Sequence, residues 1–121
     1  MKFVNSEKAP KPVGAYSHAA VVGNFVFVSG QIPVRDGKIP ESFEERVRAV
    51  IENVKAILND VGLNLENVVK VTVYLTDLSK FEEFNEIYSE YFPQKPARAV
   101  VGVSELPKGV DIEMEVVAFK A

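Results

Sequence analysis

The order of apolar and polar residues predicts an α/β fold: a single-domain two-layer sandwich in which two helices cover one face of a mixed β-sheet. Three observations predict it. Apolar residues recur at about 3.6 residues in two segments, as in amphipathic helices. Several short segments are apolar or alternate in the manner of strands. No repeat, low-complexity tract or Ser/Gly-rich linker divides residues 1–121, so we expect one domain.

A β-hairpin is predicted near the N-terminus. Residues 21–22 and 25–28 are apolar, and Gly23 with Asn24 between them signals a two-residue turn. We expect the chain to leave the second strand as a loop at residues 29–33, and the Asp-Gly pair at 36–37 predicts a further turn.

A long amphipathic helix follows the hairpin. Its apolar residues at helical spacing are Phe43, Val47, Val50, Ile51, Val54, Ile57, Leu58 and Val61. Ser42 with Glu45 forms a capping-box pattern at its start, and Gly62 suits a left-handed end.

A second helix is predicted from Phe81 to about Phe92. Ser79 with Glu82 repeats the capping pattern, and the apolar side is made by Phe81, Phe84, Ile87, Tyr88 and Tyr91. The helix has to end here because Pro93 cannot continue it.

Three further strands complete the sheet. Residues 68–75 alternate, with Val69, Val71, Val73 and Leu75 on one face and Val68, Lys70, Thr72 and Tyr74 on the other. Residues 98–103 and 110–119 predict the last two strands, joined by a turn at 106–109. In the last strand Val110, Ile112, Met114 and Val116 alternate with three acids, Asp111, Glu113 and Glu115, which we expect on one face.

Both helices should lie on the same side of the sheet, because right-handed crossovers that advance in one direction place them there. The other face then has no helical cover. Its expected residues are in part apolar: Val68, Thr72, Tyr74, Val117 and Phe119. We therefore expect that face to pack against another subunit.

The amino-acid composition excludes several kinds of catalytic and metal site. The 121 residues include no Cys and one His, which excludes disulfides, thiolate metal sites, cysteine nucleophiles and poly-His metal sites. With 14 basic and 17 acidic residues the net charge is −3, so nucleic acid is not an expected partner. No signal-peptide pattern and no stretch of membrane-spanning length is present, so a soluble cytoplasmic protein is the expectation.

Two charged residues are candidates for a role in ligand binding or catalysis. Arg98 starts a strand in an apolar segment, where its planar fork can bind a carboxylate or phosphate. Glu113 lies mid-strand, where a partly desolvated acid can handle a proton. The simpler interpretations are a surface arginine paired with an acid and a solvated acidic face, and the local pattern alone favours them.

Polar residues near strand ends form a second group. Tyr16 and His18 lie in a loop that suits either a pocket wall or a packed turn, and a lone His18 is more typical of structure than of catalysis. Ser29 with Gly30 permits close backbone approach to a ligand or simply ends a strand. Asn85 on the second helix points inward or lies exposed.

Five sequence blocks together resemble one known family. They are GAYSHA at 14–19, VSGQIP at 28–33, FNEIY at 84–88, PARAVV at 96–101 and LPKGVDIEME at 106–115. In this order and spacing, from about residue 9 to residue 118, they resemble the reactive-intermediate deaminase family of the RidA or YjgF type.

The resemblance implies a chorismate-mutase-like fold and a homotrimer whose sheets form a central barrel, with a cleft between each pair of subunits. It implies hydrolytic deamination of enamines and imines, such as 2-aminoacrylate/2-iminopropanoate and 2-iminobutanoate, to 2-keto acids and ammonia. Pyridoxal-phosphate-dependent dehydratases acting on serine and threonine generate these compounds. No cofactor or metal is implied.

The resemblance also implies site residues. Arg98 matches the arginine that clamps the substrate carboxylate, and Glu113 matches the acid that places or activates the attacking water. The pocket lining is matched by Tyr16, Ser29, the Gly30 backbone, Asn85 and Val100. Val100 stands where many members have cysteine, and Ala15 and His18 replace the usual proline and glutamine around the tyrosine.

Three other functions compete with deamination. A small-carboxylate binding or regulatory module, binding keto acids or amino acids without significant turnover, would use the same Arg98 pocket. Chorismate mutase activity shares the fold, but it needs several cations around a dianion and only Arg98 is well placed. An RNA-directed role, as in relatives named translation inhibitors, conflicts with the acidic charge balance.

Overall fold

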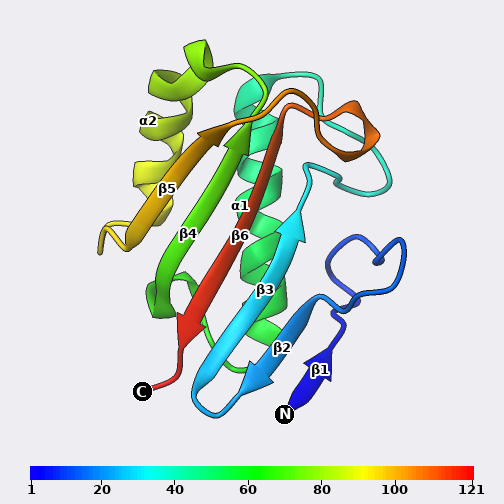
Figure 1. Cartoon of the computed structure of the whole chain (residues 1–121), viewed down its shortest axis with the longest axis vertical. Helices are drawn as coiled ribbons and strands as arrows, with labels where there is room; N and C mark the ends of the chain where they lie inside the picture. Colours follow the sequence, from blue (N-terminus) through cyan, green and yellow to red (C-terminus); the bar gives the residue numbers. More distant parts are fainter.

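Six strands form one mixed sheet in the order β1-β2-β3-β6-β4-β5 in the computed structural model, which describes residues 1–121 (Figure 1). The strands are β1 (Lys2–Val4), β2 (Ala19–Val22), β3 (Phe25–Gln31), β4 (Val68–Leu75), β5 (Ala97–Gly102) and β6 (Ile112–Phe119). Neighbouring strands are antiparallel except β4 and β5, which are parallel. The sheet is therefore mixed, as predicted, and β1 is a short edge strand that the sequence patterns did not predict.

Two helices, α1 (Phe43–Asp60) and α2 (Phe81–Tyr91), lie behind the sheet in Figure 1. Strands β3, β4 and β5 run in the same direction, and a helix follows β3 and β4 on the way to the next of them. Right-handed crossovers that advance the same way across the sheet put both helices on one face, which confirms the two-layer sandwich. Neither helix combines the length and apolar character needed to cross a membrane.

The core lies between the helices and the sheet. Its fully buried members include Val47, Val50, Ile51 and Val54 of α1, Phe84 of α2, Val71, Val73 and Leu75 of β4, and Ile112 and Met114 of β6. Full burial of an apolar side chain of this size stabilises the fold by about 1.5–3 kcal/mol. This packing holds the helices firmly against the sheet, and so it fixes the positions of the site residues that these elements carry.

The helix ends match the predictions for α1 but not for α2. Ser42 Oγ accepts the Glu45 N–H at 3.1 Å, and Gly62 has a φ of +80°. The predicted cap of α2 at Ser79 is wrong, because Asp77 caps a short 3₁₀ turn (Leu78–Lys80) that leads directly into the helix. Asp77 Oδ1 accepts the Ser79 N–H at 3.0 Å, and Lys80 at the start of α2 makes no side-chain cap.

Strand β3 extends further than predicted. Instead of leaving as a loop after Val28, the chain stays paired with β6 as far as Gln31. Val28 pairs with Val116 and Gln31 with Met114, so two residues, Ser29 and Gly30, stand opposite the single residue between them on β6. This β-bulge allows a Ser-Gly pair to remain inside a strand.

A second bulge changes the faces at the start of β4. Val68 pairs with Ala118 and Lys70 with Val117, so Val69 is an extra residue. Val68 is buried, whereas Val69 is 43% exposed, and the predicted alternation is wrong for both. Val68 therefore belongs to the core rather than to the open face.

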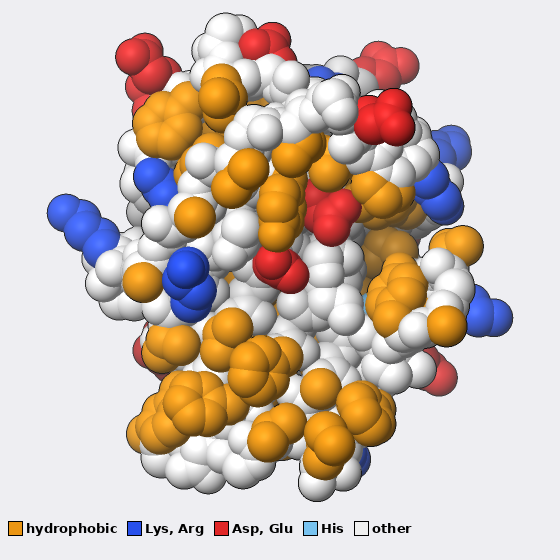
Figure 2. All heavy atoms as spheres, viewed as in Figure 1, with side chains coloured by type: hydrophobic (Ala, Val, Ile, Leu, Met, Phe, Trp, Pro, Cys, Tyr) orange, Lys and Arg blue, Asp and Glu red, His pale blue; other side chains and the backbone are white.

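The sheet face opposite the helices is open in the single chain and partly apolar. Phe25, Phe27, Val101 and Phe119 are between 36% and 46% exposed. Phe25 and Phe119 contact each other edge-on with ring centres 5.0 Å apart. Figure 2 shows apolar side chains gathered over the lower part of this face, with acidic groups higher up. A monomer seldom leaves such a patch in water, which agrees with the expectation that another subunit covers it.

Candidate functional site

A cleft of about 1,100 Å³ lies at the end of β3. Its floor is made by Ser29, Gly30 and Gln31 of β3 with Glu113 and Glu115 of β6. The rest of the lining comes from residues 7–11 with Val13 and Tyr16, from residues 32–39, from the 3₁₀ turn that holds Pro107 and Lys108, and from Asn53 of α1. Nowhere in the chain do three or more His, Asp or Glu side chains group as metal ligands.

Glu113 lies directly over Gly30. A Cβ on Gly30 would lie 2.9 Å from Glu113 Cδ and inside contact distance of Oε2, so the absence of a side chain at Gly30 gives the carboxylate its place. Burial raises the pKa of Glu113, and the negative charge of Glu115 raises it further. Glu115 itself accepts the Tyr74 hydroxyl hydrogen at 2.7 Å. Glu113 thus holds its proton more tightly than an ordinary glutamate, which suits an acid/base group.

Asp111 does not share the face of Glu113. Strand β6 begins only at Ile112, and Asp111 binds Arg46 of α1 through both carboxylate oxygens, at 2.9 and 3.0 Å. The predicted row of three acids on one face is therefore wrong for Asp111, because the strand begins later than expected and an arginine of α1 is within reach.

The loop before β2 places Tyr16 on the cleft, contacts Ser29 of β3, and keeps His18 away from the cleft. Tyr16 is 48% exposed on the cleft wall, and its hydroxyl oxygen accepts the Val13 N–H at 3.3 Å. Ser29 Oγ donates to the Ser17 carbonyl at 2.6 Å, so this hydroxyl fastens the wall to the floor. His18 is buried, and both of its ring nitrogens are hydrogen-bonded to the loop backbone.

Arg98 lies on the other side of the sheet, against α2. Its guanidinium carbon is 4.8 Å from the centre of the Tyr88 ring and 5.7 and 6.0 Å from those of Phe81 and Phe84. Nη1 donates to Asn85 Oδ1 at 2.7 Å. We call these three rings and the amide the Arg98 cage. Val100 is two residues further along β5 and shares the face of Arg98.

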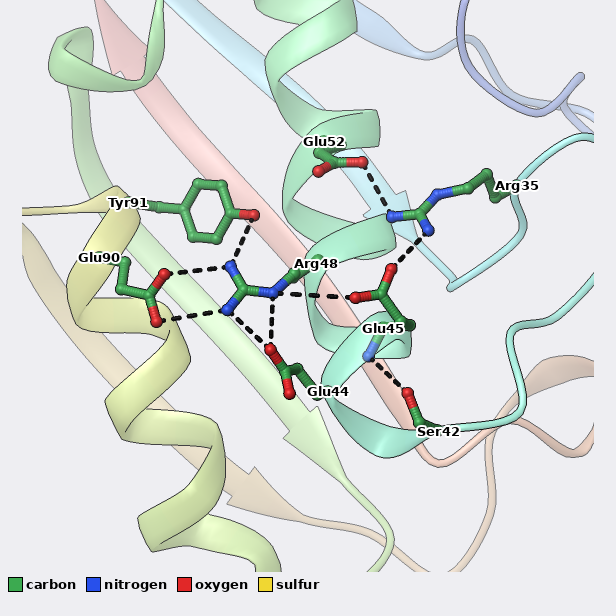
Figure 3. Close-up of polar contacts among 8 residues, drawn as sticks. All are labelled: Arg35, Ser42, Glu44, Glu45, Arg48, Glu52, Glu90 and Tyr91. Atoms are coloured by element: carbon green, nitrogen blue, oxygen red, sulfur yellow. Dashed lines mark hydrogen bonds and ion pairs between the residues drawn. The ribbon is translucent and has the colours of Figure 1, made fainter.

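No carboxylate pairs with Arg98. Every other arginine of the chain is in an ion pair: Arg46 with Asp111, Arg35 with Glu45 and Glu52, and Arg48 with Glu44, Glu45 and Glu90, the last two sets being drawn in Figure 3. The interpretation of Arg98 as a surface arginine paired with an acid is therefore wrong. Aromatic rings orient a guanidinium without neutralising it, so Arg98 keeps its positive charge, and the N–H groups not used by Asn85, for an anion.

A single chain does not bring Arg98 and Glu113 together. Arg98 is in register with Val71, which pairs in turn with Val116, three residues along β6 from Glu113. Standard strand geometry then separates the two backbones by about 10 Å along the strands and about 10 Å across them. The side chains point to opposite faces, since Arg98 contacts α2 and Glu113 lines the cleft. Tyr16, Ser29, Gly30 and Glu113 form one group, and Arg98, Asn85 and Val100 form another.

The cleft wall at residues 32–39 was missed by the sequence patterns. Asn53 of α1, only 8% exposed, donates from Nδ2 to the carbonyls of Ile32 and Val34, both at 3.1 Å. Arg35 is tied to α1 by its ion pairs with Glu45 and Glu52 (Figure 3). A polar residue at a core-facing helical position was the available signal, because Asn53 is spaced with the buried apolar residues of α1.

Comparison with known proteins assigns the family. The family model described as endoribonuclease L-PSP matches residues 6–120. A RutC family protein of Pyrococcus abyssi is 57% identical, over 98% of this chain and 97% of its own.

Two solved structures share the fold over nearly their whole length. Escherichia coli TdcF with bound serine is 38% identical and has a TM-score of 0.96, covering 100% of both chains. RidA from an Antarctic Psychrobacter is 40% identical with a TM-score of 0.95, covering 98% of this chain and 99% of its own. The chain belongs to the RidA/YjgF family, as its sequence blocks indicated.

Proposed function

We propose that this protein hydrolyses reactive enamines and imines of 2-keto acids, such as 2-aminoacrylate/2-iminopropanoate and 2-iminobutanoate, to the keto acid and ammonia. The observation that carries the proposal is the unpaired charge of Arg98, oriented by three rings and Asn85. A guanidinium held in this way can bind a substrate carboxylate through two parallel hydrogen bonds. The serine bound to TdcF is likewise a small molecule with a carboxylate.

The reaction suits the side chains present. Water adds to the imine carbon, and the resulting carbinolamine breaks its C–N bond to give the keto acid and ammonia. Arg98 would fix the carboxylate plane and so the position of the imine carbon. Glu113 would take a proton from the attacking water and give one to the departing nitrogen, and its raised pKa favours the second step. No step calls for a cofactor, and dehydratases that release 2-aminoacrylate would supply the substrate.

The proposal requires two copies of the chain, because Arg98 and Glu113 lie on opposite faces of one sheet. The cleft of one chain would meet the Arg98 cage of its neighbour, and the apolar open face would supply area to bury. A contact between two different surfaces can close into a ring. The homotrimer implied by the family resemblance is such a ring, with one site at each interface.

The first experiment measures keto-acid release from imines generated in place by a serine or threonine dehydratase. Arg98→Ala should lower kcat/KM by at least about 30-fold, since loss of a buried charged contact costs about 2 kcal/mol or more. Glu113→Gln should lower kcat by about 100-fold, the lower end of acid/base contributions. Lys55→Gln removes an exposed charge on α1 and serves as the control. Wild-type rates in either site variant would remove that residue from the mechanism.

The second experiment tests the shared site. Arg98→Ala and Glu113→Gln chains are mixed in equal amounts, unfolded together and refolded. If each site takes Arg98 from one chain and Glu113 from its neighbour, random assembly restores about one quarter of the sites. If each chain held a complete site, mixing would restore none.

A binding module without significant turnover is the second candidate, favoured by the serine bound in TdcF. It predicts that Arg98→Ala loses affinity for small carboxylates while the wild type does not accelerate imine hydrolysis. Keto-acid release above the uncatalysed rate, abolished by Glu113→Gln, would decide for the enzyme.

A further inference from the structure

We propose that His18 is a positioning residue: its buried imidazole holds the cleft wall that carries Tyr16, and thereby sets how tightly the site binds substrate. The effect on binding rests on the proposed deamination, whereas the effect on the wall follows from contacts within this chain. The connection between β1 and β2 contains no helix or strand, yet it supplies one whole wall of the cleft.

Both nitrogens of the His18 ring are used to hold this wall. The ring is 1% exposed, and Nδ1 accepts the Ser6 N–H at 2.9 Å. A backbone N–H can only donate, so the neutral ring carries its proton on Nε2, which donates to the Pro10 carbonyl at 2.6 Å. Ser6 and Pro10 flank Glu7, Lys8 and Ala9, which line the cleft. The imidazole therefore holds the wall on both sides of these three lining residues, at the start of the segment that leads to Tyr16.

Little else attaches the wall. The remaining backbone N–H bonds of residues 6–16 stay within the segment: Lys8 to Ser6 Oγ, Val13 to the Tyr16 hydroxyl and Tyr16 to the Gly14 carbonyl. Its charged residues, Glu7, Lys8 and Lys11, form no ion pair. Ala9, which belongs to the core, and the hydrogen bond from Ser29 Oγ to the Ser17 carbonyl at the end of the wall are its further anchors. Without the imidazole, the wall would depend on its two ends and on this alanine.

The backbone of the same residue connects the wall to the floor. The His18 carbonyl accepts the Ser29 N–H at 2.8 Å, and Ser29 Oγ donates to the Ser17 carbonyl at 2.6 Å. Ser29 precedes Gly30, over which Glu113 lies. The hydrogen bonds of Ser29 to the Ser17 and His18 carbonyls thus fix the position of the wall relative to the strand over which the Glu113 carboxylate lies.

The kinetic test compares His18→Leu, which removes both ring hydrogen bonds, with His18→Gln, whose side-chain amide can accept one and donate the other. KM for imine hydrolysis should rise about tenfold in His18→Leu, equivalent to about 1.4 kcal/mol of substrate binding, and return to near wild type in His18→Gln. Lower stability alone reduces the active fraction and the apparent kcat without raising KM. Ile57→Val, which removes one methylene from the buried face of α1, is the control for that effect.

Amide hydrogen exchange gives a readout that needs no activity. In His18→Leu the amides of residues 6–16, Ser6 above all, should exchange faster than in wild type, and His18→Gln should restore their protection. Unchanged exchange in His18→Leu overturns the role of His18, and so does an unchanged KM. If the wild type hydrolyses no imine, the proposed function fails, while the exchange result still decides whether His18 holds the wall.

Discussion

Replacing Gly30 with alanine puts a methyl group where the Glu113 carboxylate now lies. The new Cβ would lie 2.9 Å from Glu113 Cδ and 3.3 Å from Cγ, and closer still to Oε2. Carbon atoms in contact keep about 3.5–4.0 Å, so the carboxylate has to move by about 1 Å or more. The displaced atoms are the end of a flexible side chain, so we expect the backbone of β3 to stay in place.

Stability and activity should respond differently to Gly30→Ala. Alanine reduces the freedom of the unfolded chain by about 0.4–1 kcal/mol, and an off-rotamer Glu113 costs about 0.5–1.5 kcal/mol, so the net change in unfolding free energy is within about 1 kcal/mol. A misplacement of about 1 Å in a catalytic group costs about 100-fold in rate. Kinetics of keto-acid release and urea unfolding measure the two effects.

A matched control tests whether the effect of a glycine-to-alanine clash depends on its location in the cleft. In Gly102→Ala the new Cβ would meet Leu78 Cδ1 at 2.9 Å, which is also the end of a flexible side chain, outside the cleft. This variant should keep the wild-type kcat. Wild-type kcat in folded Gly30→Ala would refute the assignment of proton transfer to Glu113 at its present position.

Three other changes test separate parts of the structure. Tyr88→Phe should raise the unfolding free energy by about 1 kcal/mol in urea, because the buried hydroxyl has no hydrogen-bond partner; a lower value would show that it has one. The folded pKa of Glu113 is above its ordinary value of 4.5, so its contribution to stability is full below that pH and is lost as pH rises through the folded pKa. Glu113→Gln lacks this loss, so its unfolding free energy should rise relative to wild type as the pH is raised above 4.5, and a constant difference would contradict the raised pKa. Arg48→Met breaks the ion pair with Glu44 within α1 and the ion pair with Glu90 of α2, and should lower the melting temperature more in dilute buffer than in about 1 M salt, where such pairs are screened; an equal loss would assign the effect to packing.

Local patterns predicted most of the fold, because helical periodicity and turn residues are read within a few positions. The two bulges were not predictable in this way. Val69 is the extra residue in β4 only because its neighbours pair with Ala118 and Val117, about 50 residues away in the chain. Alternation assumes that every residue has a partner, so it placed Val68 on the wrong face.

The face of the sheet that each candidate site residue occupies was not predictable from the sequence. The family blocks named Arg98 and Glu113, but which face each occupies depends on the order of strands in the sheet. The local pattern favoured a surface arginine paired with one of the 17 acids of the chain, because arginines at strand ends are common. The structure instead surrounds its guanidinium with rings of α2, and no short-range pattern in the sequence shows that every carboxylate lies out of reach.

The unpaired guanidinium of Arg98 also couples the stability of the protein to its chemical surroundings. In the folded protein this cation has no counter-charge, so an anion that binds to it there stabilises the folded state relative to the unfolded state. Any small carboxylate that binds there stabilises the folded state by about 2.7 kcal/mol at a concentration 100 times its Kd. The keto acid released by the proposed reaction is such an anion, so product would compete with substrate while protecting the protein, and acetate or citrate buffers would do the same in the test tube.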